Sequence, residues 1–412
     1  MSGGPISLVG AYERDNFGDL LLGLVTRDLI GRPVRWTAPT TGDTDHLLGA
    51  EVVAYPQEFA DRPQGAVWLV GGEVGGVTLR GMLRYNSLAT ELTDTSGLEH
   101  PYLLRPSQFA GTADRPFVVN SAGISGVLRL KPMDAAMARA SLREADAISV
   151  RDPRSSRLLE EWGVEHLLAP DVVHALPRVH PVTAGQEDAV VVQVRAKDTE
   201  RLTPAGLAEL LGSVPGLSGL RVRMFVAGTA PGHDSTEHYT EVIAAYREQF
   251  PAGSIELIPT RDPFELAEAI ATSRLWIGTS LHGRIISAAY GVARVSLNVP
   301  KVNRYAAHWD PAMPYGVEIA ELTTAVENAF RADPLSAVGL SEQAVANAVR
   351  LATLLDEAGD AQAPRSERRA ASRELLAAEC AALQPPKPPR PPQPRVPLLR
   401  RLVRKARSVL PR

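Results

Sequence analysis

Residues 275–298 read Leu-Trp-Ile-Gly-Thr-Ser-Leu-His-Gly-Arg-Ile-Ile-Ser-Ala-Ala-Tyr-Gly-Val-Ala-Arg-Val-Ser-Leu-Asn. The pattern predicts a buried strand, a tight turn, a helix capped by Ser280 and stopped by Gly291, and a second strand. His282 then lies in the first helical turn, where backbone N–H groups have no intrahelical partner and the helix dipole is positive. A phosphate or carboxylate bound there would lie against the imidazole. The alternative is that His282 only caps the helix.

Short apolar runs alternate with helical patterns along the rest of the chain. Strands are expected at 6–10, 34–36, 52–54, 66–70, 117–120, 147–150, 189–194, 222–227, 255–258 and 275–277. Such alternation is typical of parallel sheets covered by helices on both faces. A polar, proline-containing stretch at 177–188 divides the series in two. The sequence therefore predicts an α/β protein of two doubly wound, Rossmann-like domains that face a cleft.

Four regions follow from this division. We expect an N-terminal domain at 1–176, a second domain at 189–330, a helical extension at 331–383 with helices at 341–357 and 365–383, and a tail at 384–412. The first domain is expected to hold the acceptor and the second the donor. Residues 78–115 show little periodicity, so loops and broken helices are expected there.

Polar residues and glycines follow the first strands of the N-terminal domain. Asn16 and Asp19 lie in the turn after the first strand, and Gly71-Gly72-Glu73 ends a buried strand. Parallel sheets gather ligands at the carboxyl ends of their strands, and glycine lets backbone approach a ligand closely. Asn and Asp also cap helices without binding anything, and Glu73 could simply face solvent.

Two cationic residues occupy similar positions. Arg151 ends a strand, and Asp152-Pro153 then starts a helix. A planar guanidinium can bind a carboxylate or phosphate through two hydrogen bonds, although a structural pair of Arg151 with Asp152 or Glu160 would explain it equally. Lys301 follows the strand after the His282 helix, where an exposed loop lysine is the alternative.

Five motifs in this order resemble those of the polysaccharide pyruvyl transferases, over residues 6 to about 310. They are Asn-x-Gly-Asp at 16–19, Gly-Gly-Glu at 71–73, Ser-x-Arg-Asp-x-x-Ser at 149–155, Pro-Asp at 170–171 and Ser-Leu-His-Gly at 280–283. Two motifs depart from the family. Glu73 replaces a third glycine, and Ser280 replaces an arginine that many members carry before Leu-His. Arg284, a half turn on, is the candidate to replace its anion contact.

The resemblance implies a GT-B-like fold and transfer of a pyruvyl group from phosphoenolpyruvate to a sugar of a cell-surface polysaccharide or its lipid-linked precursor. It implies His282 as the acid, with Arg151 and Lys301 holding the donor. The predicted substrate-binding residues are Asn16, Asp19, Gly71, Gly72, Glu73, Ser280 and Arg284. No metal ligand spacing appears, so neither a metal nor a cofactor is expected. The alternatives are a GT-B-type glycosyltransferase using a nucleotide sugar and a catalytically lapsed sugar-binding homologue.

Composition gives the setting. The chain has 412 residues with a single cysteine, Cys380, and neither a leader pattern nor a run of 18 apolar residues, so a cytoplasmic protein is expected. Residues 384–412 hold nine Lys or Arg and no acid, so the first 383 residues carry −12 against −3 for the whole chain. Eight prolines at 384–397 predict an extended spacer, and apolar and basic residues alternate at helical spacing beyond it.

This tail predicts peripheral docking on an anionic membrane surface. A disordered solubilising tail is the alternative. Nucleic acid is not expected as a partner, because the tail lacks interleaved aromatic residues and the acidic body would repel a polyanion.

Overall fold

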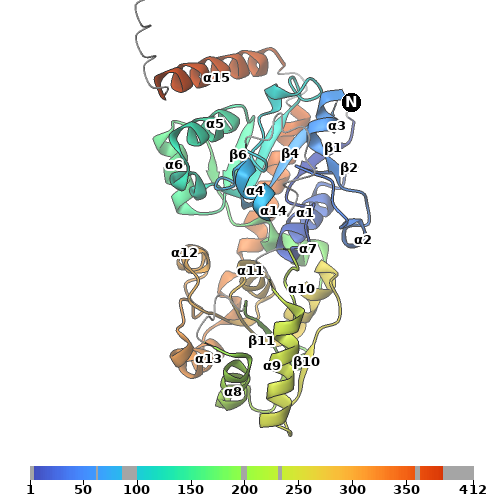
Figure 1. Cartoon of the computed structure of the whole chain (residues 1–412), viewed down its shortest axis with the longest axis vertical. Coiled ribbons are helices and arrows are strands. Elements are labelled where there is room, and N and C mark those ends of the chain that lie inside the picture. The colour runs from blue at the N-terminus through green and yellow to red at the C-terminus, as the bar shows by residue number, and fades with distance from the viewer. Residues whose placement is uncertain are drawn as a thin grey trace, which may run out of the picture.

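The computed structural model describes residues 4–61, 64–85, 100–195, 202–230, 234–357 and 362–383. Two parallel sheets, each with helices on both faces, lie end to end (Figure 1). The predicted α/β architecture of two Rossmann-like sheets is confirmed. Within the described residues, no helix has both the length and the apolar character that a membrane span requires.

The first sheet has the strand order β3-β2-β1-β4-β5-β6-β7, with every neighbouring pair parallel. Its strands are β1 (Ile6–Val9), β2 (Val34–Ala38), β3 (Val53–Ala54), β4 (Ala66–Glu73), β5 (Phe117–Gly123), β6 (Ala147–Val150) and β7 (Leu167–Leu168). Its helices are α1 (Phe17–Ile30), α2 (Asp45–Leu48), α3 (Tyr55–Asp61), α4 (Leu79–Tyr85), α5 (Pro132–Arg143), α6 (Pro153–Glu161) and α7 (Leu176–Val179). The order reverses between β1 and β4, which is where such sheets bind ligands.

The second sheet repeats the plan with the order β10-β9-β8-β11-β12, again all parallel. Its strands are β8 (Glu187–Gln193), β9 (Arg221–Met224), β10 (Ile255–Leu257), β11 (Ser273–Gly278) and β12 (Ala293–Ser296). Its helices are α8 (Pro204–Ser213), α9 (Thr236–Gln249), α10 (Pro263–Thr272), α11 (Leu281–Tyr290), α12 (Pro300–Trp309) and α13 (Leu322–Arg331). The reversal here falls between β8 and β11.

Local capping explains where the helices nearest the cleft begin. Asn16 caps α1 by accepting from the Gly18 N–H at 3.2 Å, and Asp152 caps α6 by accepting from the Ser155 N–H at 2.9 Å. Ser280 caps α11 by accepting from the Gly283 N–H at 3.2 Å. Each cap fixes the turn between a strand and its helix, so polar residues of these turns take defined places at the cleft.

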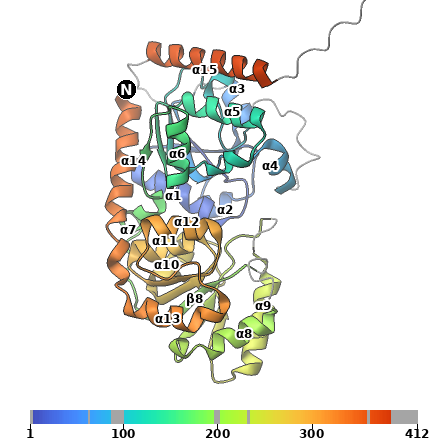
Figure 2. The same ribbon diagram turned by 90° about the vertical axis from the view of Figure 1, so that its left-hand side faces the viewer.

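The predicted helical extension consists of α14 (Leu340–Glu357) and α15 (Gln362–Leu383). Helix α14 runs from the second domain back along the first (Figure 2), and its Ala344, Leu351 and Leu355 join the same apolar core as α1. Helix α15 crosses α5, where Arg139 and Arg143 pair with Glu379 at 2.9 and 3.3 Å. The predicted tail at 384–412 lies outside the described residues.

Candidate active site

A cavity of about 270 Å³ lies between the two sheets. Its walls come from the carboxyl ends of β1, β4 and β6 in the first domain and of β8, β11 and β12 in the second. Eight of the ten predicted site residues line it, namely Asn16, Asp19, Gly72, Glu73, Arg151, Ser280, His282 and Lys301. The structure therefore brings residues up to 285 positions apart in the sequence to one place.

The turn between β1 and α1 forms one wall. The Asn16 Nδ2 donates to Asp19 Oδ2 at 2.7 Å, and Arg14 Nη2 donates to the same oxygen at 3.0 Å. The Asp19 side chain is 15% exposed. Asn16 thus combines the turn chemistry and the cleft position that the sequence left as alternatives.

Gly18 brings this turn against the histidine. A Cβ atom built on Gly18 would lie 1.9 Å from His282 Nδ1, far inside van der Waals contact. Only glycine therefore allows α1 to approach α11 this closely, although the backbone of Gly18 is not in a left-handed conformation.

The end of β4 forms the second wall. Gly72 has a φ of 93°, which favours glycine, and Glu73 reaches the cavity while its Oε1 accepts from the Gly126 N–H at 2.9 Å. Burial raises the pKa of Glu73 above its ordinary value, against the lowering effects of that hydrogen bond and of Arg151. Although Glu73 has exposed surface, its carboxyl group therefore takes up a proton more readily than that of a free glutamate.

Gly71 corrects one prediction, because it does not line the cavity. A Cβ atom there would lie 2.9 Å from the Ser121 carbonyl oxygen. Gly71 lets β4 and β5 pack closely, and we no longer assign it to substrate binding.

Arg151 leaves β6 and is almost buried. Its Nη1 donates to Asp171 Oδ2 at 2.5 Å, and Trp309 Nε1 donates to its carbonyl oxygen at 2.8 Å. The structural partner is therefore Asp171, not the Asp152 or Glu160 that the sequence suggested. Burial alone would raise the pKa of Asp171, but the charges of Arg151 and His282 outweigh it and lower that pKa.

His282 lies in the first turn of α11, as predicted, with 12% of its side chain exposed. Burial lowers its pKa from 6.5 to about 4, with Arg151 and Lys301 acting in the same direction and Asp171 and Asp19 opposing them. Nε2 is buried, has no hydrogen-bond partner among the described residues and lies 3.9 Å from Asp171 Oδ2. The imidazole is therefore neutral at pH 7 in the free protein.

Lys301 is exposed at the cavity, in the first turn of α12 behind Pro300. The sequence placed it on a loop at a strand end, and the short helix α12 replaces that loop. Ser280 also lines the cavity, is half-buried and already accepts the α11 cap hydrogen bond.

Arg284 corrects a second prediction. Its side chain is 1% exposed and does not line the cavity, and its Nη2 forms an ion pair with Asp310 at 2.8 Å. Nη1 donates to Ser296 Oγ and to the Pro314 carbonyl oxygen at 3.0 and 2.9 Å. Because these contacts hold the guanidinium inside the second domain, Arg284 cannot replace the missing anion contact of Ser280.

Sequence reasoning did not assign several residues of the site. Asp171 was noted only as part of a Pro-Asp turn, and it lies behind both Arg151 and His282. Further lining comes from Arg14, Tyr102, Gln193, Arg195 and Thr279. Gln193 lies near the end of the strand predicted at 189–194, Arg195 follows that strand directly, and Thr279 lies two residues after the strand predicted at 275–277. Their positions at strand ends were the available signal.

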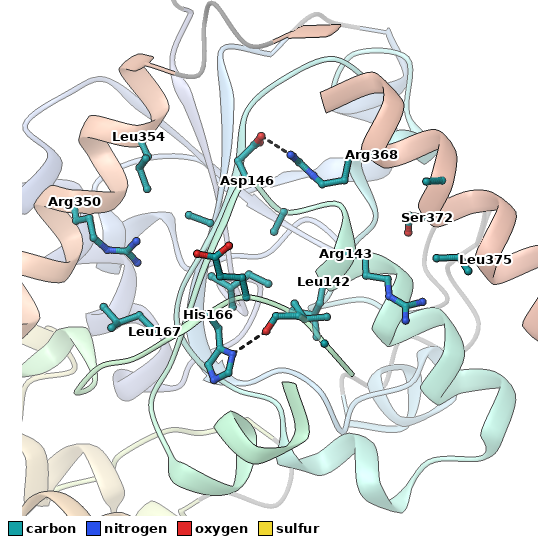
Figure 3. A pocket seen from close by; sticks show the side chains of 17 residues that line it. Leu142, Arg143, Asp146, His166, Leu167, Arg350, Leu354, Arg368, Ser372 and Leu375 are labelled. Atoms are coloured by element: carbon teal, nitrogen blue, oxygen red, sulfur yellow. Dashed lines mark hydrogen bonds and ion pairs between the residues drawn. The ribbon is translucent and has the colours of Figure 1, made fainter. Parts of the chain in front are cut away.

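A larger cavity of about 730 Å³ lies at the opposite end of the first sheet, among β6, β7, α14 and α15. Figure 3 shows Arg350 and Arg143 on opposite sides of it and Arg368 bonded to Asp146. It adjoins the amino ends of β6 and β7, away from the strand ends that collect the polar motifs. We therefore place the candidate active site in the cleft between the sheets.

The solved structures similar to the chain include a putative UDP-N-acetylglucosamine 2-epimerase from Listeria monocytogenes, at 12% identity over 88% of this chain and 98% of that one, with a TM-score of 0.50. The UDP-GlcNAc 2-epimerase from Methanocaldococcus jannaschii matches at 11% identity over 82% and 98%, with a TM-score of 0.47. A sucrose-phosphate synthase from Thermosynechococcus elongatus matches at 13% identity over 91% and 100%, with a TM-score of 0.43. At these identities the likeness concerns the fold alone.

The two Rossmann-like domains face each other across the strand-end cleft in a GT-B-like arrangement. No curated protein matches the sequence. The family model for polysaccharide pyruvyl transferase matches residues 57–299, which is more than half of the chain. The chain therefore belongs to the polysaccharide pyruvyl transferase family.

Proposed function

We propose that this protein transfers a pyruvyl group from phosphoenolpyruvate to a sugar of a cell-surface polysaccharide or of its lipid-linked precursor. The observation that carries the proposal is the convergence of His282, Arg151, Lys301 and Glu73 on one cleft of a family member. The donor is a compact trianion, and these residues offer three cationic or protonatable groups beside a single carboxylate.

The reaction would begin with a proton passing from the His282 imidazolium to the methylene carbon of phosphoenolpyruvate. This makes the adjacent carbon electrophilic, and one sugar hydroxyl adds to it and gives up its proton. A second hydroxyl then displaces inorganic phosphate from the same carbon and closes the ketal, and the proton of this hydroxyl leaves with the phosphate as hydrogen phosphate. No cofactor takes part, because phosphoenolpyruvate supplies both the transferred group and the leaving group.

The charges of the cleft support these roles. Arg151 can bind the donor carboxylate or phosphate through the guanidinium N–H groups that Asp171 does not use. Lys301 stands at the start of α12 and His282 at the start of α11, where the helix dipoles favour anions. Because His282 is neutral in the free protein, it needs the negative charge of the donor nearby in order to take up the proton it transfers.

Glu73 is the proposed base for the acceptor hydroxyl. A carboxylate whose pKa is raised by burial is closer to the working pH and takes up a proton more readily. In this proposal the family's third glycine has been exchanged for a group that acts on the acceptor.

Thermal unfolding with and without ligand tests the donor. Phosphoenolpyruvate at 100 times its dissociation constant should add about 2.7 kcal/mol to the free energy of unfolding. A panel of nucleotide sugars should give no increase in the free energy of unfolding. Protection by a nucleotide sugar alone would replace the proposal with a glycosyltransferase.

A phosphate-release assay tests the reaction itself. Phosphoenolpyruvate together with lipid-linked sugars should release inorganic phosphate, whereas either substrate alone should not. Donor binding without release across the panel would favour a lapsed sugar-binding homologue.

We also propose that residues 384–412 hold this cytoplasmic enzyme on the inner face of the membrane, near lipid-linked acceptors. The support is the sequence: Arg400, Arg401, Arg404, Lys405 and Arg407 alternate with apolar residues, and each basic residue near an anionic leaflet contributes about 1 kcal/mol. Sedimentation with anionic vesicles should pellet the full chain and leave a chain ending at residue 383 in solution. Equal behaviour of the two forms would contradict this proposal without touching the enzymatic one.

A further inference from the structure

The side chains of Arg151 and His282 converge on one oxygen atom of Asp171. Arg151 Nη1 donates to Asp171 Oδ2 at 2.5 Å, and His282 Nε2 lies 3.9 Å from that same oxygen. The other carboxylate oxygen, Oδ1, accepts from the Val173 N–H at 3.0 Å. Oδ2 is therefore the atom for which Arg151 and His282 compete.

The main chain that carries Asp171 is held firmly. Its own N–H donates to Tyr305 Oη at 3.1 Å, and the preceding carbonyl, of Pro170, accepts from Ser121 Oγ at 3.0 Å. Asp171 is also fully buried. Because its backbone is fixed, a change at the cleft alters the partner of Oδ2 and not the position of the carboxylate.

In the free protein Arg151, and not His282, is hydrogen-bonded to Asp171 Oδ2. The groups facing His282 are Asp171 behind it, Asp19 from α1, Arg151 from the end of β6 and Lys301 from α12. With Arg151 bound to Oδ2, the buried Nε2 is left without a hydrogen-bond partner among the described residues. The nearest carboxylate is thus paired with Arg151, so it stabilises a second proton on His282 less and the pKa of His282 stays low.

We propose that Asp171 is a positioning residue that exchanges Arg151 for His282 as its partner when an anion enters the cleft. The guanidinium of Arg151 turns toward the anion, and the His282 ring moves toward the fixed carboxylate to close the 3.9 Å gap between Nε2 and Oδ2. Oδ2 then accepts a hydrogen bond from Nε2–H of His282. A proton held at Nε2 leaves Nδ1 to carry the second proton, which is taken up from solvent. Donor binding therefore leads to protonation of His282, the proposed general acid. This inference rests on the proposed function for the identity of the anion, phosphoenolpyruvate.

The test is the titration of His282 in the full-length protein by NMR, with its ring signal assigned through its loss in His282→Gln. In the wild type, phosphoenolpyruvate should raise the titration midpoint by about 1 to 3 pH units. In Asp171→Asn, which removes the charge but keeps the shape, the rise should fall to less than half of that. Asp146→Asn is the matched control, because it removes a carboxylate that pairs with Arg365 and Arg368 at the far end of the sheet and should behave as the wild type.

A second variant needs no donor. Arg151→Gln frees Oδ2 and should raise the His282 midpoint in the unliganded protein, and this remains measurable even if Asp171→Asn fails to fold. An equal rise with phosphoenolpyruvate in the wild type and in Asp171→Asn would overturn the inference and leave the proposed function standing. Absence of phosphoenolpyruvate binding to the wild type would overturn both.

Discussion

At the scale of single residues, the cleft combines an ionised carboxylate with a neutral histidine. Asp171 stays charged because the Arg151 guanidinium and the hydrogen bond from the Val173 N–H compensate its burial, whereas His282 loses its proton because its own burial outweighs the nearby carboxylates. Burial in the same low-dielectric surroundings thus raises the pKa of a carboxyl group and lowers that of a histidine, although the two groups lie only 3.9 Å apart. An incoming anion changes that balance.

Replacing His282 by alanine should lower pyruvyl transfer by about 10² to 10⁴, the usual contribution of a general acid. The fold should persist, because Ser280 and not His282 caps α11. Turnover and thermal unfolding of His282→Ala check this, with the exposed His308→Ala as control. Turnover within a few-fold of the wild type would remove the acid role.

Glu73→Gln should lower turnover at least tenfold while leaving donor affinity unchanged. Glutamine can still accept from the Gly126 N–H but cannot take up the hydroxyl proton. Steady-state kinetics with both substrates varied measure the two effects separately, and the exposed Glu165→Gln serves as control. An unchanged turnover would place Glu73 outside the chemistry.

At the scale of elements, the first turn of α1 sets the position of the first turn of α11. Gly18→Ala would normally favour a helix, yet here the new methyl group would overlap His282 Nδ1. We expect activity to fall at least tenfold with little loss of stability. Gly206→Ala, also in the first turn of a helix but with no neighbour closer than 3.4 Å, should leave activity unchanged. Full activity of Gly18→Ala would mean that His282 can move without consequence.

The elements themselves were largely predictable because caps and apolar periods are local signals. Ser280, Asp152 and Gly291 marked helix ends where the structure has them. Arg284 misled the prediction because sequence position gave its distance from His282 along the helix but not the direction of its side chain. Its partners Asp310, Met313 and Pro314 lie 26 to 30 residues further along the chain, so no local pattern revealed them.

The same limit applies to Asp171. Its pairing with Arg151 spans 20 residues and depends on how β6 and the turn before η3 (Val172–Ala175) are placed in the folded sheet. The resemblance marked the Pro-Asp turn, but only the folded chain shows which cations it meets.

At the scale of the whole molecule, buried histidines should make the protein sensitive to acid. His174 is fully buried, its pKa is lowered by burial from 6.5 to about 4, and its Nε2 lies 3.1 Å from Tyr305 Oη. The unfolded chain binds protons to His174 and His282 below pH 6.5, whereas the folded chain binds them only near pH 4. The contribution of these two histidines to the free energy of unfolding is thus complete above pH 6.5. It falls as the pH drops toward 4, by about 3 kcal/mol for each histidine.

Urea unfolding between pH 4.5 and 7 measures this slope. His174→Gln keeps an acceptor for Tyr305 but cannot titrate, so about half of the acid sensitivity assigned to the two histidines should disappear. The same slope in the variant and the wild type would contradict the assignment.

An ion pair also links the two domains beside the cleft. Asp15 accepts from Arg261 Nη2 with both oxygens at 2.6 Å and from Thr229 Oγ1 at 2.7 Å. Asp15→Ala should loosen this contact by about 1 kcal/mol, weaken donor binding about fivefold and enlarge the radius of gyration in X-ray scattering. Asp188→Ala removes the pair with Arg274 inside the second domain and should change neither. An Asp15→Ala protein with wild-type scattering and affinity would show that other contacts hold the two domains together.

The return of α14 from the second domain to the first has an evolutionary consequence. The first domain consists of two separated stretches of gene, because residues 344–355 of α14 complete the core that residues 6–176 begin. A single recombination event at 177–188 would therefore deliver a first domain without its covering helix, and a second domain carrying a helix that fits another protein. The two domains of this protein can therefore be separated with the core of the first one intact only when α14 stays with the N-terminal domain.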